Sequence, residues 1–309
     1  MKEDKAKLWI LSPLYFDVES FKKLKENIQN NLKDNAHITD IHYVLVDDSA
    51  GLDCSLHEFE KVKNLSVVTP PFNLGHQRAI VFGLRTIMGN LGDKDIIVIM
   101  DSDGEDRPED LSRVINPLFE ISKVNTVLAQ RTRRRERLLF KIMYKFYKLF
   151  FFTLTGLTVK SGNYSAHRAI FLKKIIKHPY FDLCYSSTLL ALKLPIYFVP
   201  CERGPRYFGQ SKMNFKALIK HGISLLMPFL DKMAIRSLIF FSLVFILGVI
   251  ASMVVVYIRV FTSAAIPGWA SFLTALTLMF SFVALGNFLI LFSNFSQTQG
   301  MALSFIDKK

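Results

Sequence analysis

The sequence predicts an α/β domain with a mostly parallel sheet, followed by a hairpin of two transmembrane helices. In the first two thirds of the chain, short apolar runs alternate with charged stretches of helical pattern, which is typical of βαβ units. The last quarter instead holds two long apolar runs without charge, at about 237–258 and 270–292. Half of the 309 residues are hydrophobic, which is high for a soluble protein and indicates that lipid surrounds part of the chain.

The predicted strands and helices of the first two thirds alternate in a regular order. The strands span residues 7–15, 41–50, 65–71, 95–103 and 126–131, and the helices span about 18–32, 75–89 and 107–122. The strands are continuously apolar, as expected for a sheet that is buried on both faces. The first apolar run is short, contains Pro13 and lacks a small-residue cleavage site, so we expect a strand there and no signal peptide.

Each uncharged run of the last quarter is long enough for a transmembrane helix. About 22 residues at about 1.5 Å per residue reach roughly 33 Å, and a hydrocarbon core is about 30 Å thick. A buried helical hairpin of a soluble domain is the alternative, but core helices seldom lack charge over this length. Basic residues flank the outer ends of the two runs, whereas only Arg259 lies between them. The positive-inside rule therefore predicts that the large domain and both termini are cytoplasmic.

A basic and aromatic stretch at about 134–152 predicts an amphipathic helix. Five cations fall on one face of it, namely Arg134, Arg137, Lys141, Lys145 and Lys148. We expect this helix to lie in the membrane interface with its cations toward lipid phosphates, so the lipid bilayer is an expected partner. A core helix with a solvated basic face is the alternative. A second, juxtamembrane helix is expected at 211–235.

Carboxylates follow directly after the apolar run that forms the fourth predicted strand. Asp101 and Asp103 are two apart, so on an extended backbone their side chains share a face, and Glu105 continues the series. Such an oxygen-rich group suits Mg²⁺ or Mn²⁺, which use one or two carboxylates together with water and substrate phosphates. The alternative is a solvated acidic turn that caps the helix starting near Pro108. An EF-hand is excluded, because Asp106 stands where that loop needs glycine.

The position of these carboxylates favours a ligand site. The second predicted strand also ends in two carboxylates, Asp47 and Asp48, and in parallel sheets ligands bind beyond the carboxyl ends of the strands. The formal net charge of +13 suits a membrane surface, nucleic acid or phosphorylated small molecules. No aromatic-basic RNA-binding motif occurs, so nucleic acid is not an expected partner. Three cysteines without CxxC spacing indicate neither a disulfide framework nor a zinc site, and dinucleotide, P-loop and GxSxG motifs do not occur.

Five motifs, in order along almost the whole chain, resemble those of family 2 glycosyltransferases with the GT-A fold. They are "SPLYFDVESF", "VLVDDSA", "NLGHQRAIVFGL", "MDSDGEDRPE" and "RYFGQSK". Together with two C-terminal spans, they are similar to the polyprenyl-phosphate branch, which includes dolichyl-phosphate mannose synthase and bacterial undecaprenyl-phosphate glucosyltransferases. The resemblance implies a Rossmann-like GT-A catalytic domain at 1–210, a juxtamembrane helix at 211–235, two spans within 236–309, and a bacterial inner-membrane location.

The resemblance implies an inverting, metal-dependent transfer of one sugar from a UDP- or GDP-linked donor to polyprenyl phosphate, for cell-envelope or glycan modification. The donor would contact Pro13, Tyr15, Asp17, Asp47, Asp48, Gly75, Asp101 and Ser102. Mg²⁺ or Mn²⁺ would bind Asp101, Asp103 and Glu105. The catalytic residues would be Asp103, Arg131 and Asn163, and the lipid phosphate would contact Arg203, Arg206, Ser211 and Lys212. The family includes oligomers, so the resemblance also allows a homo-oligomer.

The stretch "SGNYSAHR" departs from the family, which commonly has an acidic residue where this chain has Asn163. An asparagine cannot act as a base, so a second hypothesis is a catalytically silent GT-A domain that binds lipid or a partner at the membrane. A phosphate monoester, with a second pKa of about 6, is largely ionised at neutral pH and hardly needs a base, which favours an active enzyme. Phe16 and Ser49 replace an asparagine and a glycine of the family and leave donor recognition open. No Q-x-x-R-W motif, which processive polysaccharide synthases carry, occurs, so one sugar per lipid is expected. A third hypothesis is a membrane-tethered nucleic-acid binder, and it rests on net charge alone.

Overall fold

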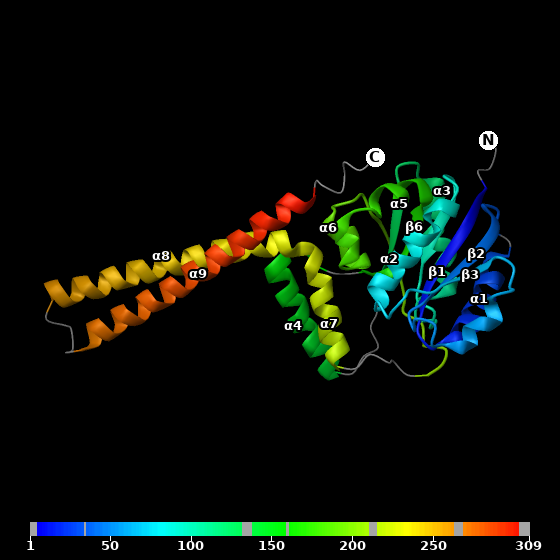
Figure 1. The fold of residues 1–309 in the computed structure, drawn as a ribbon. Helices are drawn as coiled ribbons and strands as arrows, with labels where there is room; N and C mark the ends of the chain where they lie inside the picture. Colours follow the sequence, from blue (N-terminus) through cyan, green and yellow to red (C-terminus); the bar gives the residue numbers. More distant parts are fainter. Residues whose placement is uncertain are drawn as a thin grey trace. The chain divides into compact units, whose positions relative to one another are not determined.

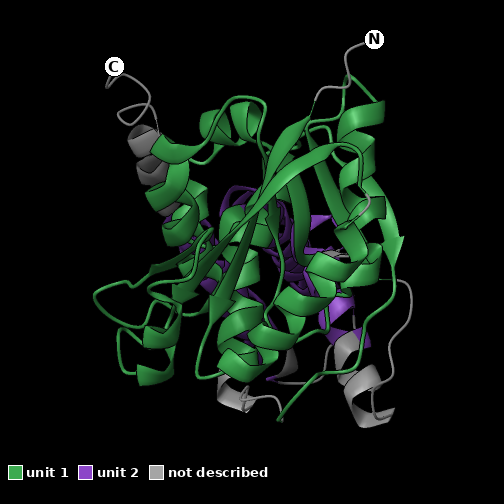
Figure 2. Ribbon diagram, turned by 90° about the vertical axis from the view of Figure 1, so that its right-hand side faces the viewer, with its two compact units in different colours: residues 1–144, 159–228 green, residues 145–158, 229–309 purple. Residues whose placement is uncertain are grey.

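The computed structural model describes residues 5–33, 35–131, 138–158, 161–209, 215–262 and 268–302. The chain divides into two compact units, shown in different colours in Figure 2. The first unit comprises residues 1–144 and 159–228, and the second comprises residues 145–158 and 229–309. Helix α4 (Leu138–Thr155) contributes to both units.

Among the described residues of the first unit, seven strands form one sheet in the order β3-β2-β1-β4-β6-β5-β7 (Figure 1). They are β1 (Ala6–Leu14), β2 (Ile38–Asp47), β3 (Leu65–Val68), β4 (Ile96–Ile99), β5 (Thr126–Arg131), β6 (Ser161–Arg168) and β7 (Tyr197–Cys201). Strand β6 runs antiparallel to its neighbours β4 and β5, and the other pairings are parallel. The predicted α/β class with a mostly parallel sheet is confirmed, although β6 and β7 were not predicted.

Helices cover both faces of this sheet. On one face lie α1 (Val18–Leu32) and α3 (Leu111–Glu120), and on the other lie α2 (His76–Ile87), α5 (Ala169–Ile175) and α6 (Tyr185–Ala191). Short 3-10 helices are η1 (Cys54–Phe59), η2 (Met88–Asn90), η3 (Pro108–Asp110), η4 (Pro179–Asp182) and η5 (Met227–Phe229), and helix α7 (Phe215–Leu226) follows β7. In β1, Leu8 and Ile10 enter the first core cluster, whereas Trp9 and Leu11 enter the second. Successive side chains thus bury opposite faces, as the continuously apolar strands predicted.

The strand register brings the predicted ligand residues to one edge of the sheet. Leu14 pairs with Asp47 at the carboxyl ends of β1 and β2. The backbone N–H of Asp48 donates to the carbonyl of Leu14 (2.9 Å), and that of Met100 donates to the carbonyl of Leu11 (3.1 Å). The segments that follow β2 and β4 therefore start on either side of β1.

The second unit is built on two long helices, α8 (Leu230–Phe261) and α9 (Trp269–Ala302). By length and composition, the segments Leu218–Phe261 and Ser271–Ser293 are candidate membrane spans. Most of their apolar side chains are exposed in the isolated chain rather than packed in a protein core. This exposure fits helices whose surroundings are lipid.

Small and hydroxyl-bearing side chains form the seam where α8 meets α9. The hydroxyls of Ser252 and Thr277 lie 2.6 Å apart. A Cβ at Gly248 would collide with the hydroxyl of Ser281, so any larger residue would force that hydroxyl to move. Close packing through small residues is typical of helix pairs in membranes.

Within the second unit, the end of α4 is fixed to the start of α8. Arg236 donates hydrogen bonds to the backbone carbonyls of Phe152 (3.1 Å) and Thr153 (2.8 Å). The rings of Phe151 and Phe229, both buried, meet edge to face with centroids 5.5 Å apart. The arginine thus satisfies the carbonyl of Thr153 in the last turn of the helix, and it shares the carbonyl of Phe152 with the backbone N–H of Gly156 (2.7 Å).

The part of α4 in the second unit exposes both cations and apolar side chains. Lys145 and Lys148 are exposed, and so are Phe146 (69%), Leu149 (63%) and Phe150 (56%). This mixture matches the surface predicted for an interfacial helix. Outside the described side chains lie Arg134, Arg137 and Lys141.

Candidate functional site

Residues 101–106, which we name the acidic turn, do not continue strand β4. The strand ends at Ile99, so the prediction that Asp101 and Asp103 share a face on an extended backbone is wrong. The backbone N–H of Asp101 donates to Asp106 Oδ2 (3.0 Å), and that of Glu105 donates to Asp103 Oδ1 (2.9 Å). These side-chain acceptors curl the backbone directly after the strand, as aspartates do in turns.

The segment that follows β7 runs along the acidic turn. The backbone N–H of Gly204 donates to the carbonyl of Glu105 (2.9 Å), and that of Tyr207 donates to the carbonyl of Asp103 (2.9 Å). Gly104 has a φ of 85° and faces the Tyr207 ring so closely that a Cβ would collide with it. A glycine is therefore required in this turn for both its conformation and its packing.

Each carboxylate of the acidic turn pairs with a basic side chain from another element. The pairs are Asp101 with His76 (3.1 Å), Asp103 with Arg206 (3.1 Å), Asp106 with Arg131 (3.3 Å) and Glu105 with Arg203. The structure thus gathers at the turn two predicted phosphate contacts, Arg203 and Arg206, together with the predicted catalytic residue Arg131. The other two predicted phosphate contacts, Ser211 and Lys212, lie outside the described residues.

Burial and crowding raise the pKa of two of these carboxyl groups. For Asp103 the pKa rises to about 6, because burial, and then the charges of Asp101 and Glu105, disfavour the ionised form. For Asp106 the pKa rises to about 7, again through burial first and the charge of Asp101 second. Burial would also raise the pKa of Asp101, but the charge and hydrogen bond of His76 outweigh it and hold that pKa well below its ordinary value. The acidic turn is therefore a place where an added cation is favoured.

The donor set of the acidic turn fits a divalent cation held by two carboxylates. Asp101 and Asp103 offer hard oxygen ligands, and Mg²⁺ typically binds one or two carboxylates and fills its shell with water and substrate phosphates. Among the residues that the structure describes, no three His, Cys, Asp or Glu side chains are grouped as metal ligands. Glu105, the third predicted ligand, pairs with Arg203.

The affinity for Mn²⁺ is expected to rise as the pH increases from about 5 to 7. Asp103 must lose its proton before its carboxylate can bind a cation, and its pKa of about 6 places this step within that range. Titration calorimetry at several pH values would measure the effect, and an affinity that is constant over the range would contradict it.

Without metal, the same raised pKa means that the contribution of Asp103 to folding stability is present below about pH 4 and is lost as the pH rises through about 6.

Asp47 and Asp48 hold the loops at the carboxyl ends of β2 and β3. Asp47 Oδ1 accepts from the backbone N–H (3.0 Å) and the hydroxyl (2.5 Å) of Ser49. The same hydroxyl accepts from the backbone N–H of Asp53 (2.9 Å), so the serine that replaces a glycine of the family strengthens this turn. Asp48 Oδ1 accepts from the backbone N–H of Gly75 (3.1 Å) at the start of α2. Contacts of these residues with a nucleotide stay a prediction.

Three other residues that are predicted to contact the nucleotide sugar lie at the ends of β1 and β4. The Ser102 hydroxyl donates to the carbonyl of Pro13 (3.4 Å), which joins the acidic turn to β1. Asp17, just before α1, accepts from Arg206 at 3.4 Å. Arg206 therefore connects the start of α1 with the acidic turn.

Tyr15 and Phe16 form an exposed aromatic pair after β1. Their ring centroids lie 4.9 Å apart, and the two side chains are 47% and 44% exposed. Phe16 has a φ of 50°, a conformation that asparagine adopts more readily than a bulky residue.

A chain of hydrogen bonds leads from α6 to the acidic turn and fixes the direction of Asn163. The backbone N–H of Ser186 donates to Gln77 Oε1 (3.0 Å), so the other end of the Gln77 amide, Nε2, donates to Asn163 Oδ1 (2.6 Å). The Asn163 amide nitrogen then faces His76 Nε2 (2.6 Å) and Asp101 Oδ1 (3.5 Å). Because a backbone N–H only donates, it sets the direction of both amides in the chain.

His76 Nε2 has two partners that need opposite protonation states. It must carry a proton to pair with Asp101, and it must lack one to accept from Asn163. Asp101 raises the pKa of His76, although burial opposes the rise. The nitrogen can therefore bond only one of these partners at a time.

Sequence reasoning missed His76 and Gln77 as members of the site. Both lie inside the motif "NLGHQRAIVFGL", directly after Gly75, whose φ is 77°. Gln77 is buried although its side chain is polar. A histidine and a glutamine at the first two positions of the helix, directly after the predicted contact Gly75, were the signal that could have identified them.

Comparisons with known proteins identify a family and a fold. The sequence model of the family described as "Glycosyl transferase family 2" matches residues 13–178, more than half of the chain. Similar solved structures include glucosyl-3-phosphoglycerate synthase from Mycobacterium tuberculosis in complex with Mn²⁺, UDP-glucose and phosphoglyceric acid, at 14% identity, with 72% of this chain and 79% of that chain covered and a TM-score of 0.51. Mannosyl-3-phosphoglycerate synthase from Rubrobacter xylanophilus has 14% identity, 72% coverage of each chain and a TM-score of 0.49. No curated protein sequence matches the chain.

Proposed function

The chain belongs to glycosyl transferase family 2, and from this premise we propose that it transfers one sugar from a nucleotide sugar to polyprenyl phosphate at a membrane. Membership and the GT-A-like α/β domain make the chain a glycosyltransferase that uses nucleotide sugars. Family membership does not identify the acceptor, so the lipid acceptor is the part of the proposal that needs support from the site. The observation that carries it is the fixed carboxamide of Asn163 beside Asp101.

Asn163 supplies hydrogen-bond donors where an acidic residue would supply a base. Gln77 fixes its direction, so the amide nitrogen faces the acidic turn. An alcohol acceptor must lose a proton during transfer, whereas a phosphate monoester, with a second pKa of about 6, is already largely ionised at neutral pH. An amide also attracts an incoming phosphate that a carboxylate would repel. These properties favour a phosphate acceptor.

The arginines of the site would bind phosphate groups of both substrates. Arg131, Arg203 and Arg206 lie together at the acidic turn, and guanidinium forks suit phosphate oxygens. Asp101 and Asp103 would hold Mg²⁺ or Mn²⁺, which supplies charge neutralisation for the leaving diphosphate. The similar M. tuberculosis structure, with Mn²⁺ and UDP-glucose, supports this choice of cofactor and a UDP-linked donor. Attack on the anomeric carbon from the face opposite the diphosphate would invert its configuration, with catalysis through positioning and charge.

The second unit supports a location in a membrane, and we propose the bacterial inner membrane. Helices α8 and α9 are long and apolar enough to cross a bilayer. The exposed lysines and aromatic residues of α4 suit the membrane interface. In this proposal, the catalytic domain and both termini are cytoplasmic, and the acceptor reaches the site from the bilayer.

A donor and acceptor screen tests the proposed function. The purified full chain in lipid nanodiscs is incubated with Mn²⁺, polyprenyl phosphate and each of several UDP- and GDP-linked sugars. We expect one donor to give a lipid product whose mass has increased by a single sugar. Mass spectrometry of the lipid fraction measures this increase.

Two outcomes of the screen would contradict the proposal in different ways. No product with any donor, while an active polyprenyl-phosphate glycosyltransferase gives product in parallel, would support the alternative of a catalytically silent domain, which the replacement of a base by Asn163 motivates. A second acceptor arm contains 3-phosphoglycerate, because a similar structure holds phosphoglyceric acid. Product only in that arm would support the proposed glycosyltransferase activity and would show that its acceptor is 3-phosphoglycerate instead of polyprenyl phosphate.

A further inference from the structure

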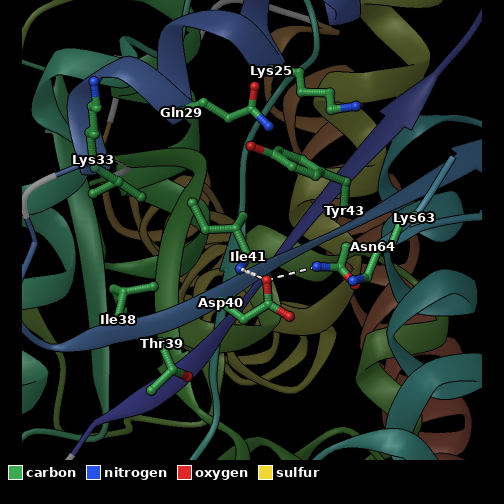
Figure 3. A pocket seen from close by; sticks show the side chains of 11 residues that line it. Lys25, Gln29, Lys33, Ile38, Thr39, Asp40, Ile41, Tyr43, Lys63 and Asn64 are labelled. Atoms are coloured by element: carbon green, nitrogen blue, oxygen red, sulfur yellow. Dashed lines mark hydrogen bonds between the residues drawn. The ribbon is translucent and has the colours of Figure 1, made fainter.

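A pocket of about 330 Å³ lies in the first unit at the amino ends of β2 and β3 (Figure 3). The catalytic candidates lie at the carboxyl ends of the strands, so this pocket is at the opposite edge of the sheet. Its walls come from the second half of α1, the start of β2 and the turn before β3. The residues used below are Lys25, Gln29, Lys33, Asp40, Tyr43 and Lys63.

The hydroxyl of Tyr43 is a buried polar group in this pocket. Tyr43 is 2% exposed, and within the described part of the chain its hydroxyl has no hydrogen-bond partner. The Phe21 ring packs edge to face against the Tyr43 ring, with centroids 5.9 Å apart, which limits its movement. Figure 3 shows the hydroxyl pointing toward the amide end of Gln29. A buried hydroxyl without a partner is costly, so a ligand that accepts its proton would be stabilised there.

The pocket carries an excess of positive charge. Lys25 lies on α1, Lys33 follows directly after its last residue, and Lys63 lies in the turn before β3. Among the described residues, none of these ammonium groups forms an ion pair. Asp40 is the carboxylate of the pocket, and its Oδ1 already accepts from the side chain of Asn64 (2.7 Å) and the backbone N–H of Ile41 (2.9 Å).

We propose that this pocket binds a phosphate-bearing anion. The Tyr43 hydroxyl and the Gln29 amide would donate to phosphate oxygens, and the three lysines would supply the charge. The pocket is separate from the acidic turn, so the ligand would act as an effector and not as a reactant. The proposal does not depend on the identity of the sugar acceptor.

Protection of lysines from acetylation tests the site directly. The full chain in nanodiscs is treated with acetic anhydride in pyrophosphate, or in chloride of equal ionic strength, and peptides are read by mass spectrometry. We expect pyrophosphate near twice its dissociation constant to slow acetylation of Lys25, Lys33 and Lys63 about threefold. Lys123, an exposed lysine elsewhere in the first unit, is the matched control and should be unaffected. Because the readout is local, binding of pyrophosphate at the acidic turn does not affect it.

The variant Tyr43→Phe removes only the hydroxyl and should fold, since that group has no partner to lose. We expect it to weaken pyrophosphate binding about tenfold, and Lys63→Ala to weaken it as well. Equal protection in Tyr43→Phe and the unaltered chain, or no protection in either, would overturn the proposal and leave water as the partner of the hydroxyl. A further arm uses nanodiscs of phosphatidylglycerol, with phosphatidylcholine as control. Protection by the anionic lipid alone would identify a lipid headgroup as the source of the phosphate.

Discussion

Replacing Asp103 with asparagine is expected to abolish Mn²⁺-dependent binding of the nucleotide sugar and to lower turnover by about 10²–10³-fold. Asp103 is one of the two carboxylates that would hold the cation, and burial, followed by the charges of Asp101 and Glu105, raises its pKa, so a bound cation would relieve an unfavourable buried charge. Asparagine keeps the size of the side chain and one oxygen, but it removes the charge. Calorimetry with a UDP-sugar, with and without Mn²⁺, measures binding, and formation of glycolipid measures turnover.

Asp110→Asn is the matched control for this substitution. Asp110 is also buried and also pairs with an arginine, Arg113, at 2.8 Å, but it lies beyond the acidic turn at the start of α3. Its replacement should affect stability and leave metal-dependent binding in place. If Asp103→Asn binds the donor with unchanged metal dependence, Asp103 is not a ligand and the proposed metal site is wrong.

Replacing Gln77 with leucine is expected to lower turnover by about 10–100-fold while donor binding changes little. Gln77 is not among the residues predicted to contact the donor, the metal or the acceptor, but it is the residue that fixes the Asn163 carboxamide. Without it, the amide can rotate, and its oxygen can face Asp101, which repels it. A misplaced group near the reacting atoms can cost about 10²-fold. The ratio of kcat to KM for donor and acceptor, measured separately, would show which step is lost.

A double-mutant cycle separates positioning from structural support. In the Asn163→Ala background there is no amide to orient, so Gln77→Leu should have little further effect on turnover. Gln77 Oε1 also accepts from the thiol of Cys184 (3.1 Å) and from Ser186, and loss of these contacts would persist in that background. An equally large effect of Gln77→Leu in both backgrounds would show that Gln77 only supports the fold. Cys184→Ala, which keeps the amide chain, is the control.

The fold was predictable where burial follows from apolar residues alone. Strand β5, Thr126–Arg131, has the predicted bounds, because its apolar run ends sharply. Strand β6 was missed because buried polar residues interrupt its apolar ones: Ser165 and His167 bond the hydroxyl of Tyr185 at 2.7 and 2.6 Å. Only these tertiary partners make such a strand stable inside the protein. Strand β7 contains Pro200, which counts against a strand when the sequence is read alone.

The carboxylates of the site were predictable from the sequence, but their hydrogen bonds and ion pairs were not. Spacing identified Asp101 and Asp103, yet the backbone turns after Ile99 because of a hydrogen bond to Asp106. The pairing of Asp103 with Arg206 joins segments far apart in the sequence. Such pairs depend on where the segment after β7 returns, and local patterns contain no information about that return.

The seam between α8 and α9 bears on how the chain is made. The hydroxyl of Ser252 also donates to the carbonyl of Gly248 (2.9 Å), that of Thr277 to Leu273 (3.0 Å), and that of Ser281 to Thr277 (2.8 Å). Each helix can thus satisfy its hydroxyls internally before a partner is present, so the first candidate span would be able to enter a bilayer while the second is still being synthesised. When the helices meet, Ser252 or Thr277 exchanges its own carbonyl for the other hydroxyl. That exchange conserves the number of hydrogen bonds, so it selects the register of the hairpin rather than driving its formation.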